Sequence, residues 1–215
     1  MRHKIDFSLY LITDRSILPP GYSLPDAVRE ALEGGVKCVQ LREKDLAPGS
    51  LFSLALELRE LTRRYGAKLL INDRADVALA CAADGVHLTS ASLPVAEVRK
   101  IIGPKHLIGV STHRLDEILT AEKSGADFVT FGPVYFTPSK AAFGPPVGLE
   151  KLTEVCRLSG LPVFALGGVK MERLDEIMAT GAAGVALISA ILSFPDAGSR
   201  TERFINRLSA QRQRT

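Results

Sequence analysis

Eight short apolar segments, separated by segments of helical pattern, run through this chain of 215 residues. In order, they are residues 8–13, 36–41, 68–72, 85–88, 107–110, 128–131, 163–166 and 184–188. Their continuous apolar character is typical of strands that are buried on both faces, as in a parallel sheet. Alternation of strand and helix eight times over predicts a closed (β/α)8 barrel, also called a TIM barrel.

Apolar residues recur at helical spacing between the predicted strands. Leu51, Leu54, Leu58 and Leu61 form one such stripe, and Leu208 belongs to the apolar face of a final helix. Hydrophobic residues make up 46% of the chain, which is enough for one sizeable core, and no linker or low-complexity stretch interrupts it. We therefore expect a single domain that covers residues 1–215.

The composition limits the classes of function. The 27 basic residues nearly balance the 24 acidic ones, and the net charge of +3 is too small to indicate a nucleic-acid partner. No apolar run is long enough for a membrane span, and the first residues lead into a strand without a secretory apolar stretch, so we expect a cytoplasmic protein. Cys38, Cys81 and Cys156 form no C-x-x-C pair and indicate neither a zinc knuckle nor a disulfide framework. A homo-oligomer is compatible with this composition, but nothing in it requires one.

Active sites of (β/α)8 barrels lie at the carboxyl ends of the strands, so the residues there are the first candidates. The second predicted strand runs into Gln40, Arg42 and Lys44. In extended chain these three side chains point to one side, because alternate residues share a face. Arginine offers a planar fork to phosphate oxygens and lysine a compact charge, so the pair is suited to a diphosphate.

The third, fourth and fifth predicted strands also end in polar residues. Asn72 and Asp73 follow the third strand, where they could cap a helix or hold Mg²⁺ against a phosphate. His87, in the fourth strand, is expected to be a hydrogen-bonded barrel residue. Ser111 and His113 follow the fifth strand, and a histidine there could transfer protons near neutral pH or make structural bonds only.

A long irregular segment follows the sixth predicted strand. Residues 132–148 contain four prolines and three glycines, too many for a helix. A loop of this length in a compact barrel is usually functional, often as a lid. Within it, the hydroxyls of Thr137 and Ser139 and the ammonium of Lys140 form a plausible anion clamp.

The last two predicted strands end in small residues before a new helix. Gly167 and Gly168 follow one strand, and Ile188 and Ser189 follow the other. In (β/α)8 barrels the loops after strands 7 and 8 and a helix N-terminus frequently bind phosphate. Glycines allow the backbone to approach such a group closely. The sequence therefore predicts a phosphorylated small-molecule ligand.

In combination, these motifs resemble those of the thiamine phosphate synthase family over residues 9–192. The segments that carry the resemblance are Leu-Tyr-Leu-Ile-Thr-Asp at residues 9–14, Val-Gln-Leu-Arg-Glu-Lys at 39–44, Ile-Asn-Asp-Arg at 71–74, Gly-Val-His-Leu at 85–88, Ile-Gly-Val-Ser-Thr-His at 108–113, Phe-Gly-Pro-Val-Tyr at 131–135, Thr-Pro-Ser-Lys at 137–140 and Leu-Gly-Gly-Val at 166–169. The resemblance implies a (β/α)8 barrel. It also implies an enzyme of thiamine biosynthesis that joins hydroxymethylpyrimidine diphosphate to thiazole phosphate and releases diphosphate.

The resemblance further implies roles for single residues. The positions that match the pyrimidine diphosphate site are Gln40, Arg42, Lys44, Asn72 and Lys140. Asp73 matches a ligand of Mg²⁺, and Ser111 matches a residue near the reacting pyrimidine. Thr137 and Ser139 match the hydroxyl pair of the lid. The positions that match the thiazole phosphate site are Gly168, Ile188 and Ser189.

One position departs from the family pattern. Ser92 stands where the synthases usually have the aspartate that is the second Mg²⁺ ligand, and a hydroxyl is a poorer ligand for a hard cation. A thiazole tautomerase branch of the same family needs no metal and uses a histidine at the position of His113. We favour the synthase because the diphosphate-side residues are retained. The alternatives are the tautomerase, a non-catalytic protein that binds thiamine precursors, and a sugar-phosphate isomerase, against which the Thr-Pro-Ser-Lys segment argues.

Overall fold

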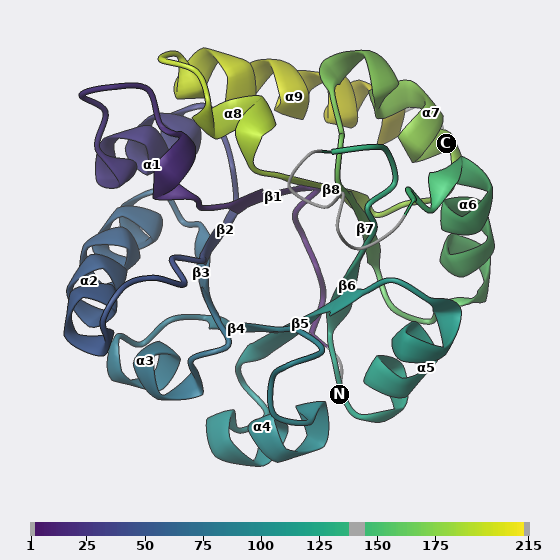
Figure 1. The fold of residues 1–215 in the computed structure, drawn as a ribbon, viewed down its shortest axis with the longest axis horizontal. Coiled ribbons are helices and arrows are strands. Elements are labelled where there is room, and N and C mark those ends of the chain that lie inside the picture. Colours follow the sequence, from purple (N-terminus) through teal and green to yellow (C-terminus); the bar gives the residue numbers. More distant parts are fainter. Residues whose placement is uncertain (1–2, 138–144, 213–215) are drawn as a thin grey trace.

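The computed structural model describes residues 3–137 and 145–212. Eight parallel strands close into a barrel in chain order, and β8 pairs with β1. The strands are β1 (Leu9–Ile12), β2 (Cys38–Leu41), β3 (Lys68–Asn72), β4 (Gly85–Leu88), β5 (Leu107–Thr112), β6 (Phe128–Phe131), β7 (Val163–Leu166) and β8 (Gly184–Leu187). Figure 1 shows the strands as an inner ring with the helices outside it. The predicted (β/α)8 barrel is confirmed.

The strand bounds follow the sequence-based prediction closely. Strands β3, β4, β6 and β7 have the predicted bounds, while β1 is shorter by one residue at each end, β2 by two at its start and β8 by one at its end. Strand β5 is longer, because Ser111 and Thr112 pair with Thr130 and Phe131 of β6. These two polar residues extend the strand beyond the apolar run on which the prediction depended.

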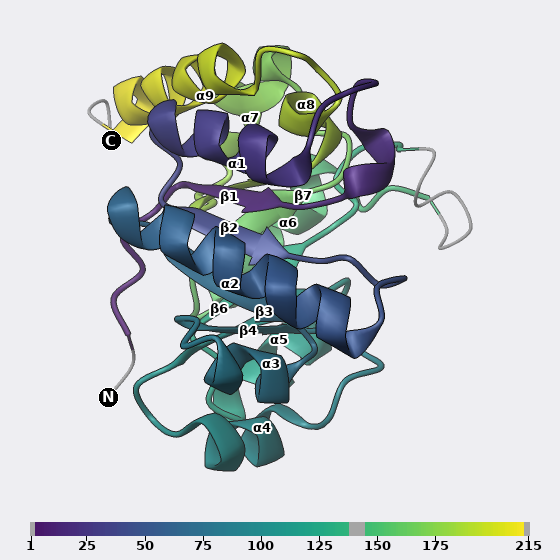
Figure 2. The same ribbon diagram turned by 90° about the vertical axis from the view of Figure 1, so that its left-hand side faces the viewer.

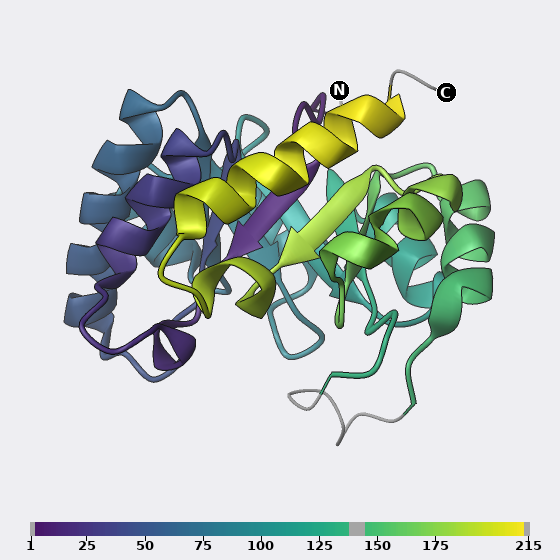
Figure 3. The same ribbon diagram turned by 90° about the horizontal axis from the view of Figure 1, so that it is seen from above.

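Helices connect the strands and cover the outside of the barrel. They are α1 (Leu24–Glu33), α2 (Pro48–Arg64), α3 (Ala75–Ala80), α4 (Val95–Ile102), α5 (Leu115–Lys123), α6 (Gly148–Leu158), α7 (Leu174–Ala179), α8 (Ser189–Leu192) and α9 (Ala197–Arg212), with short 3-10 turns η1 (Arg15–Ile17) and η3 (Met171–Arg173). The predicted stripe of α2 is buried at Leu51 and Leu58 and partly buried at Leu54 and Leu61. Figure 3 shows α9 lying across the barrel between α1 and α7. None of the described helices is long and apolar enough to cross a membrane.

Aromatic side chains fill the interior of the barrel. Phe7, Tyr10, Phe128 and Phe164 form one buried cluster with apolar residues from other strands. The ring centroids of Phe7 and Phe164 are 5.1 Å apart and stacked, and Phe7 meets Phe128 edge to face at 5.6 Å. Because Phe7 precedes β1, the N-terminal segment closes this end of the barrel, and the opposite end remains for polar side chains.

Two aspartates brace the amino-terminal end of the barrel. Asp84 pairs with Arg59 at 2.6 Å and accepts a hydrogen bond from the backbone N–H of Leu69. Asp127 pairs with Arg99 at 2.7 Å and accepts from the backbone N–H of Ile108. Each aspartate precedes its own strand and ties it to the strand before it.

The carboxyl ends of the strands meet at the other end, which is called the mouth below. In Figure 2 the arrowheads of β1 and β2 point to the right, and the segments that follow them leave the sheet on that side. The N-terminus lies on the opposite side. The candidate residues that follow strands in the sequence therefore belong to one end of the molecule.

Candidate functional site

Polar side chains replace the aromatic cluster toward the mouth. Alternation along the strands puts Gln40, Asn72 and Thr130 on the same inward face as the cluster residues Cys38, Leu70 and Phe128, two positions before them. His87 occupies the position of β4 that pairs with Asn72, and Ser111 occupies the position of β5 that pairs with Thr130. The predicted residues Gln40, Asn72 and Ser111 thus come from separate strands to one end of the barrel interior.

A chain of hydrogen bonds crosses this interior. The amide nitrogen Nε2 of Gln40 donates to the hydroxyl of Tyr10 at 2.8 Å. The Tyr10 hydroxyl lies 3.3 Å from Nδ1 of His87, and Nε2 of His87 lies 3.0 Å from Oγ of Ser111. Tyr10, Gln40, His87 and Ser111 are called the inner polar row below.

His87 is neutral in this environment. Burial, and in second place the positive charge of Arg42, lowers its pKa from 6.5 to about 3. Both of its ring nitrogens have hydrogen-bond partners, which agrees with the interpretation of His87 as a hydrogen-bonded barrel residue. Burial also raises the pKa of the Tyr10 hydroxyl well above its usual value. The inner polar row therefore carries no net charge at neutral pH.

Arg42 is held by a network between the segments after β1 and β2. The backbone N–H of Arg42 donates to the hydroxyl of Thr13 at 2.9 Å, and this hydroxyl donates to the carboxylate of Glu43 at 2.6 Å. Glu43 is buried and also accepts from the backbone N–H of Arg15 at 3.2 Å. Burial raises the pKa of Glu43. Strand β2 ends at Leu41, and Lys44 lies exposed in the following turn, so alternation along the strand does not determine where Lys44 points.

Asp73 adopts a backbone conformation that is rare for this residue. Its φ is 62°, in the left-handed region, where aspartate is tolerated at some cost in energy. Helix α3 begins at Ala75 with Arg74 as the N-cap residue, and the Arg74 side chain makes no capping hydrogen bond. The interpretation of Asn72 and Asp73 as helix caps is therefore wrong. Asp73 is exposed after β3, where its carboxylate is accessible to a ligand.

Ser92 closes a turn after β4. Its hydroxyl accepts a hydrogen bond from the backbone N–H of Thr89 at 2.8 Å and lies 3.2 Å from the Thr89 hydroxyl. Within residues 3–137 and 145–212, no group of three histidine, cysteine, aspartate or glutamate side chains could hold a metal ion. One carboxylate fits Mg²⁺ only if phosphate oxygens and water complete the shell, which is how this ion is commonly bound. Asp73 is therefore compatible with a substrate-dependent Mg²⁺ site.

His113 follows β5 and is tied to the start of the long irregular segment. Its Nδ1 lies 2.5 Å from the carbonyl oxygen of Gly132, which accepts, so Nδ1 carries a hydrogen. The backbone N–H of His113 donates to Glu117 of α5 at 2.6 Å. In the neutral ring Nε2 is then an acceptor on an exposed residue.

The glycine pair after β7 packs against the segment after β6. Gly167 and Gly168 have φ of 93° and 64°, and a Cβ would lie 2.6 Å from Cβ of Pro133 and 2.7 Å from Cβ of Tyr135, respectively. The need for glycine is thus explained by a protein contact, and phosphate binding by Gly168 stays a prediction. Helix α8 begins at Ser189 with Ile188 as its N-cap residue, as the sequence indicates.

The predicted lid is described in part. The described residues between β6 and α6 form no helix or strand, as predicted. Thr137 is half-buried there, while Ser139 and Lys140 lie outside the described residues.

The sequence interpretation did not find several residues of the mouth. Tyr10 is at the centre of the inner polar row, and Thr13 and Glu43 position Arg42. The Thr130 hydroxyl is buried without a hydrogen-bond partner among the described residues, which is unusual for a buried polar group. The sequence does mark two of them. Tyr10 in β1 and Thr130 in β6 each carry a hydroxyl at an inward position of a strand that is otherwise apolar.

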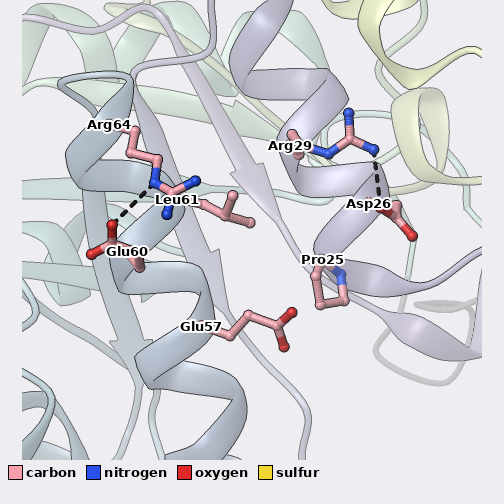
Figure 4. Close-up of a pocket in the computed structure, with 7 residues that line it drawn as sticks. All are labelled: Pro25, Asp26, Arg29, Glu57, Glu60, Leu61 and Arg64. Carbon is pink, nitrogen blue, oxygen red and sulfur yellow. Dashed lines mark hydrogen bonds and ion pairs between the residues drawn. The ribbon is translucent and has the colours of Figure 1, made fainter.

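A separate cavity lies outside the barrel between α1 and α2. It has a volume of about 310 Å³ and is lined by Pro25, Asp26, Arg29, Glu57, Glu60, Leu61 and Arg64. Figure 4 shows the ion pairs Asp26–Arg29 and Glu60–Arg64 on its two walls. None of the predicted site residues lines it.

Comparisons with known proteins agree with these observations. The family model for thiamine monophosphate synthase matches residues 9–191. A putative thiamine-phosphate synthase of Geobacter sulfurreducens is 54% identical over 202 residues, which are 94% of each chain. The thiamine-phosphate synthase of Clostridium novyi is 42% identical over 94% of this chain and 98% of its own. A solved structure of thiamine phosphate pyrophosphorylase from Pyrococcus furiosus superposes with a TM-score of 0.86 at 37% identity, covering 95% of this chain and 96% of its own. The chain belongs to the thiamine monophosphate synthase family.

Proposed function

We propose that the protein is a thiamine-phosphate synthase, a transferase that joins hydroxymethylpyrimidine diphosphate to thiazole phosphate. The observation that carries the proposal is the inner polar row, which brings Gln40 and Ser111 from different strands to the mouth beside Arg42. Family membership over nearly the whole chain supports the same reaction. The proposed unit is one domain, residues 1–215, that acts on phosphorylated small molecules in the cytoplasm.

The proposed substrate contacts follow the strand ends. The residues assigned to the pyrimidine diphosphate are Gln40, Arg42, Lys44, Asn72 and Lys140. Thr137 and Ser139 of the lid contribute hydroxyls, and Gly168, Ile188 and Ser189 bind the thiazole phosphate. Positive charge on Arg42, Lys44 and Lys140 compensates the charge of the diphosphate, as required for tight binding of such an anion.

In the proposed reaction the bond between the pyrimidine methylene carbon and the diphosphate oxygen breaks, and the electron pair leaves with diphosphate. The thiazole nitrogen then forms the new carbon–nitrogen bond. Mg²⁺ held by Asp73 and by diphosphate oxygens would supply further charge compensation for the leaving group. The chain contributes by positioning the two substrates and by fixed charges and dipoles, which are the principal terms in such catalysis.

The test is a turnover assay with both substrates and Mg²⁺. Thiamine phosphate should form, and Lys140→Ala and Arg42→Ala should each reduce kcat/KM by at least tenfold. The matched controls Lys123→Ala and Arg63→Ala, exposed at the last turns of α5 and α2, should have little effect. Conversion of a thiazole carboxylate tautomer without metal, lost in His113→Ala, would instead support the tautomerase, and binding without turnover would contradict both enzymes.

A further inference from the structure

The inner polar row has a direction that follows from its donors and acceptors. The Gln40 amide nitrogen can only donate, so the Tyr10 oxygen accepts in that bond. The single hydrogen of the Tyr10 hydroxyl is then available for Nδ1 of His87. An Nδ1 that accepts carries no hydrogen, and a neutral imidazole therefore has its one hydrogen on Nε2. This hydrogen is donated to Oγ of Ser111.

The row begins in the interior and ends at the mouth. Tyr10, Gln40 and His87 are at most 1% exposed, whereas Ser111 is half-buried. Water therefore has little access to the first three side chains, and a reversal of one bond requires reversal of the others. Ser111 is the most exposed member of the row and the one whose hydroxyl hydrogen is not used within the row.

The position of the His87 ring is fixed by its surroundings. Gly109 is paired in register with His87, and a Cβ at Gly109 would lie 2.6 Å from Nδ1 of His87. The rings of Phe128 and Tyr10 lie against His87, with centroids 5.9 Å and 5.6 Å away. The absence of a side chain at Gly109 thus provides the space in which the imidazole connects Tyr10 to Ser111.

We propose that Tyr10 and His87 are positioning residues that make the Ser111 hydroxyl a hydrogen-bond donor toward the substrate. Because Ser111 Oγ accepts from His87, its own hydrogen is directed to an acceptor atom in the mouth. The preferred partner is an acceptor such as an unprotonated ring nitrogen or an oxygen, and an amino group is disfavoured. The identity of the substrate rests on the proposed function, but the direction of the row does not.

The direction of the row can be measured without substrate. In the full-length protein with ¹⁵N-labelled histidine, the signals of the four histidines report which ring nitrogen carries hydrogen, and His87→Gln identifies the signal of His87. We expect a neutral Nε2–H tautomer at pH 7. An Nδ1–H tautomer, or a protonated ring, would overturn the proposal whether or not the protein catalyses the synthase reaction.

The action of His87 through Ser111 is tested by a double-mutant cycle in the synthase assay. His87→Leu should lower kcat at least tenfold with a smaller change in KM, but it should cause little further loss in a Ser111→Ala background. His87→Gln should recover much of the loss, because an amide can accept from Tyr10 and donate to Ser111 at once. The packing control Cys38→Ala alters the same interior cluster outside the row and should retain kcat.

Additive losses in the cycle, or a loss in Cys38→Ala equal to that in His87→Leu, would show that His87 acts only through packing. Tyr10→Phe keeps the ring and removes the hydroxyl, so it provides a second route if His87→Leu fails to fold. It should lower kcat and shift the His87 signal toward a mixture of tautomers, and an unchanged signal would contradict the role of Tyr10.

Discussion

At the scale of single residues, one carboxylate is present where the family pattern has two. Asp73 is exposed with a left-handed backbone, while the Ser92 hydroxyl bonds to the backbone of its own turn. Because Mg²⁺ retains its water unless several oxygen ligands converge on it, we expect no binding to the protein alone. Calorimetric titration should detect Mg²⁺ binding only after addition of diphosphate, and Asp73→Asn should abolish it.

Ser92→Asp tests whether the missing second carboxylate is the reason that the protein alone does not bind Mg²⁺. A second carboxylate at this position should allow Mg²⁺ to bind without diphosphate, and Ser90→Asp, at an exposed position of the same turn, should not. Tight Mg²⁺ binding to the unmodified protein alone would show that other residues complete the site.

The buried His87 should make the protein sensitive to acid. Its pKa is about 3 in the folded state against 6.5 for an unperturbed histidine, so the folded state favours the neutral ring. The contribution to stability is therefore fully present above pH 6.5 and is lost as the pH falls toward 3. The slope is about 1.4 kcal/mol per pH unit in this window. Urea unfolding between pH 7 and pH 4 should show a steeper decline for the wild type than for His87→Gln, and equal slopes would contradict the assignment.

These residues illustrate what the sequence could and could not predict about the site. The positions of Gln40 and Ser111 in the barrel could be predicted because alternation in a strand and the position of strand ends are readable from sequence, while their roles toward a substrate stay predictions. The role of Tyr10 was missed, because the bond that joins it to His87 links strands that are 77 residues apart. The cap interpretation of Asp73 was wrong, since cap preference is a local tendency and the left-handed turn here places Arg74 at the cap instead.

At the scale of elements, the packing of the neighbouring strands β4, β5 and β6 depends on the absence of a side chain at Gly109 of β5. A Cβ at Gly109 would lie 2.4 Å from the Phe128 ring and 2.6 Å from His87 Nδ1, and both neighbours are buried. Gly109→Ala should therefore displace both rings and destabilise the protein by about 1–3 kcal/mol, as overpacking usually does. The midpoint of urea unfolding gives the change in stability.

Gly49→Ala is the matched control for this prediction. Gly49 lies in the first turn of α2, and a Cβ there would meet nothing within 4 Å. Replacement by alanine in a helix should leave stability unchanged or raise it by up to about 1 kcal/mol. If Gly109→Ala behaves like this control, the rings of His87 and Phe128 have more freedom than the packing indicates.

Elements were more predictable from the sequence than the site. Strands buried on both faces are mostly apolar, and four strands have their predicted bounds. The error at β5 has a physical reason, because Ser111 and Thr112 continue the ladder with β6 while the apolar pattern ends before them. In β5, pattern and structure therefore differ at polar residues that pair with β6 and also lie at the mouth.

At the scale of the whole molecule, we expect residues at the amino-terminal end of the barrel to affect mainly stability and residues at the mouth to affect mainly activity. Asp127 is 4% exposed at the amino-terminal end, where it bonds Arg99 and the backbone of Ile108, far along the strands from the mouth. Removal of one partner from a buried ion pair typically costs about 3–5 kcal/mol. Asp127→Ala should therefore lower the free energy of unfolding by that amount, while kcat and KM in the folded protein remain near the wild-type values.

Asp116→Ala is the control for the whole-molecule prediction, because Asp116 forms an ion pair with Arg114 at the exposed start of α5. Exposed ion pairs are screened by solvent and contribute little to stability, so Asp116→Ala should have a much smaller effect on the free energy of unfolding than Asp127→Ala. Urea unfolding and the turnover assay at a temperature where both variants are folded give the two quantities. If Asp127→Ala lowers kcat even at a temperature where the variant is fully folded, the amino-terminal end is coupled to the mouth through the aromatic cluster that lies between them.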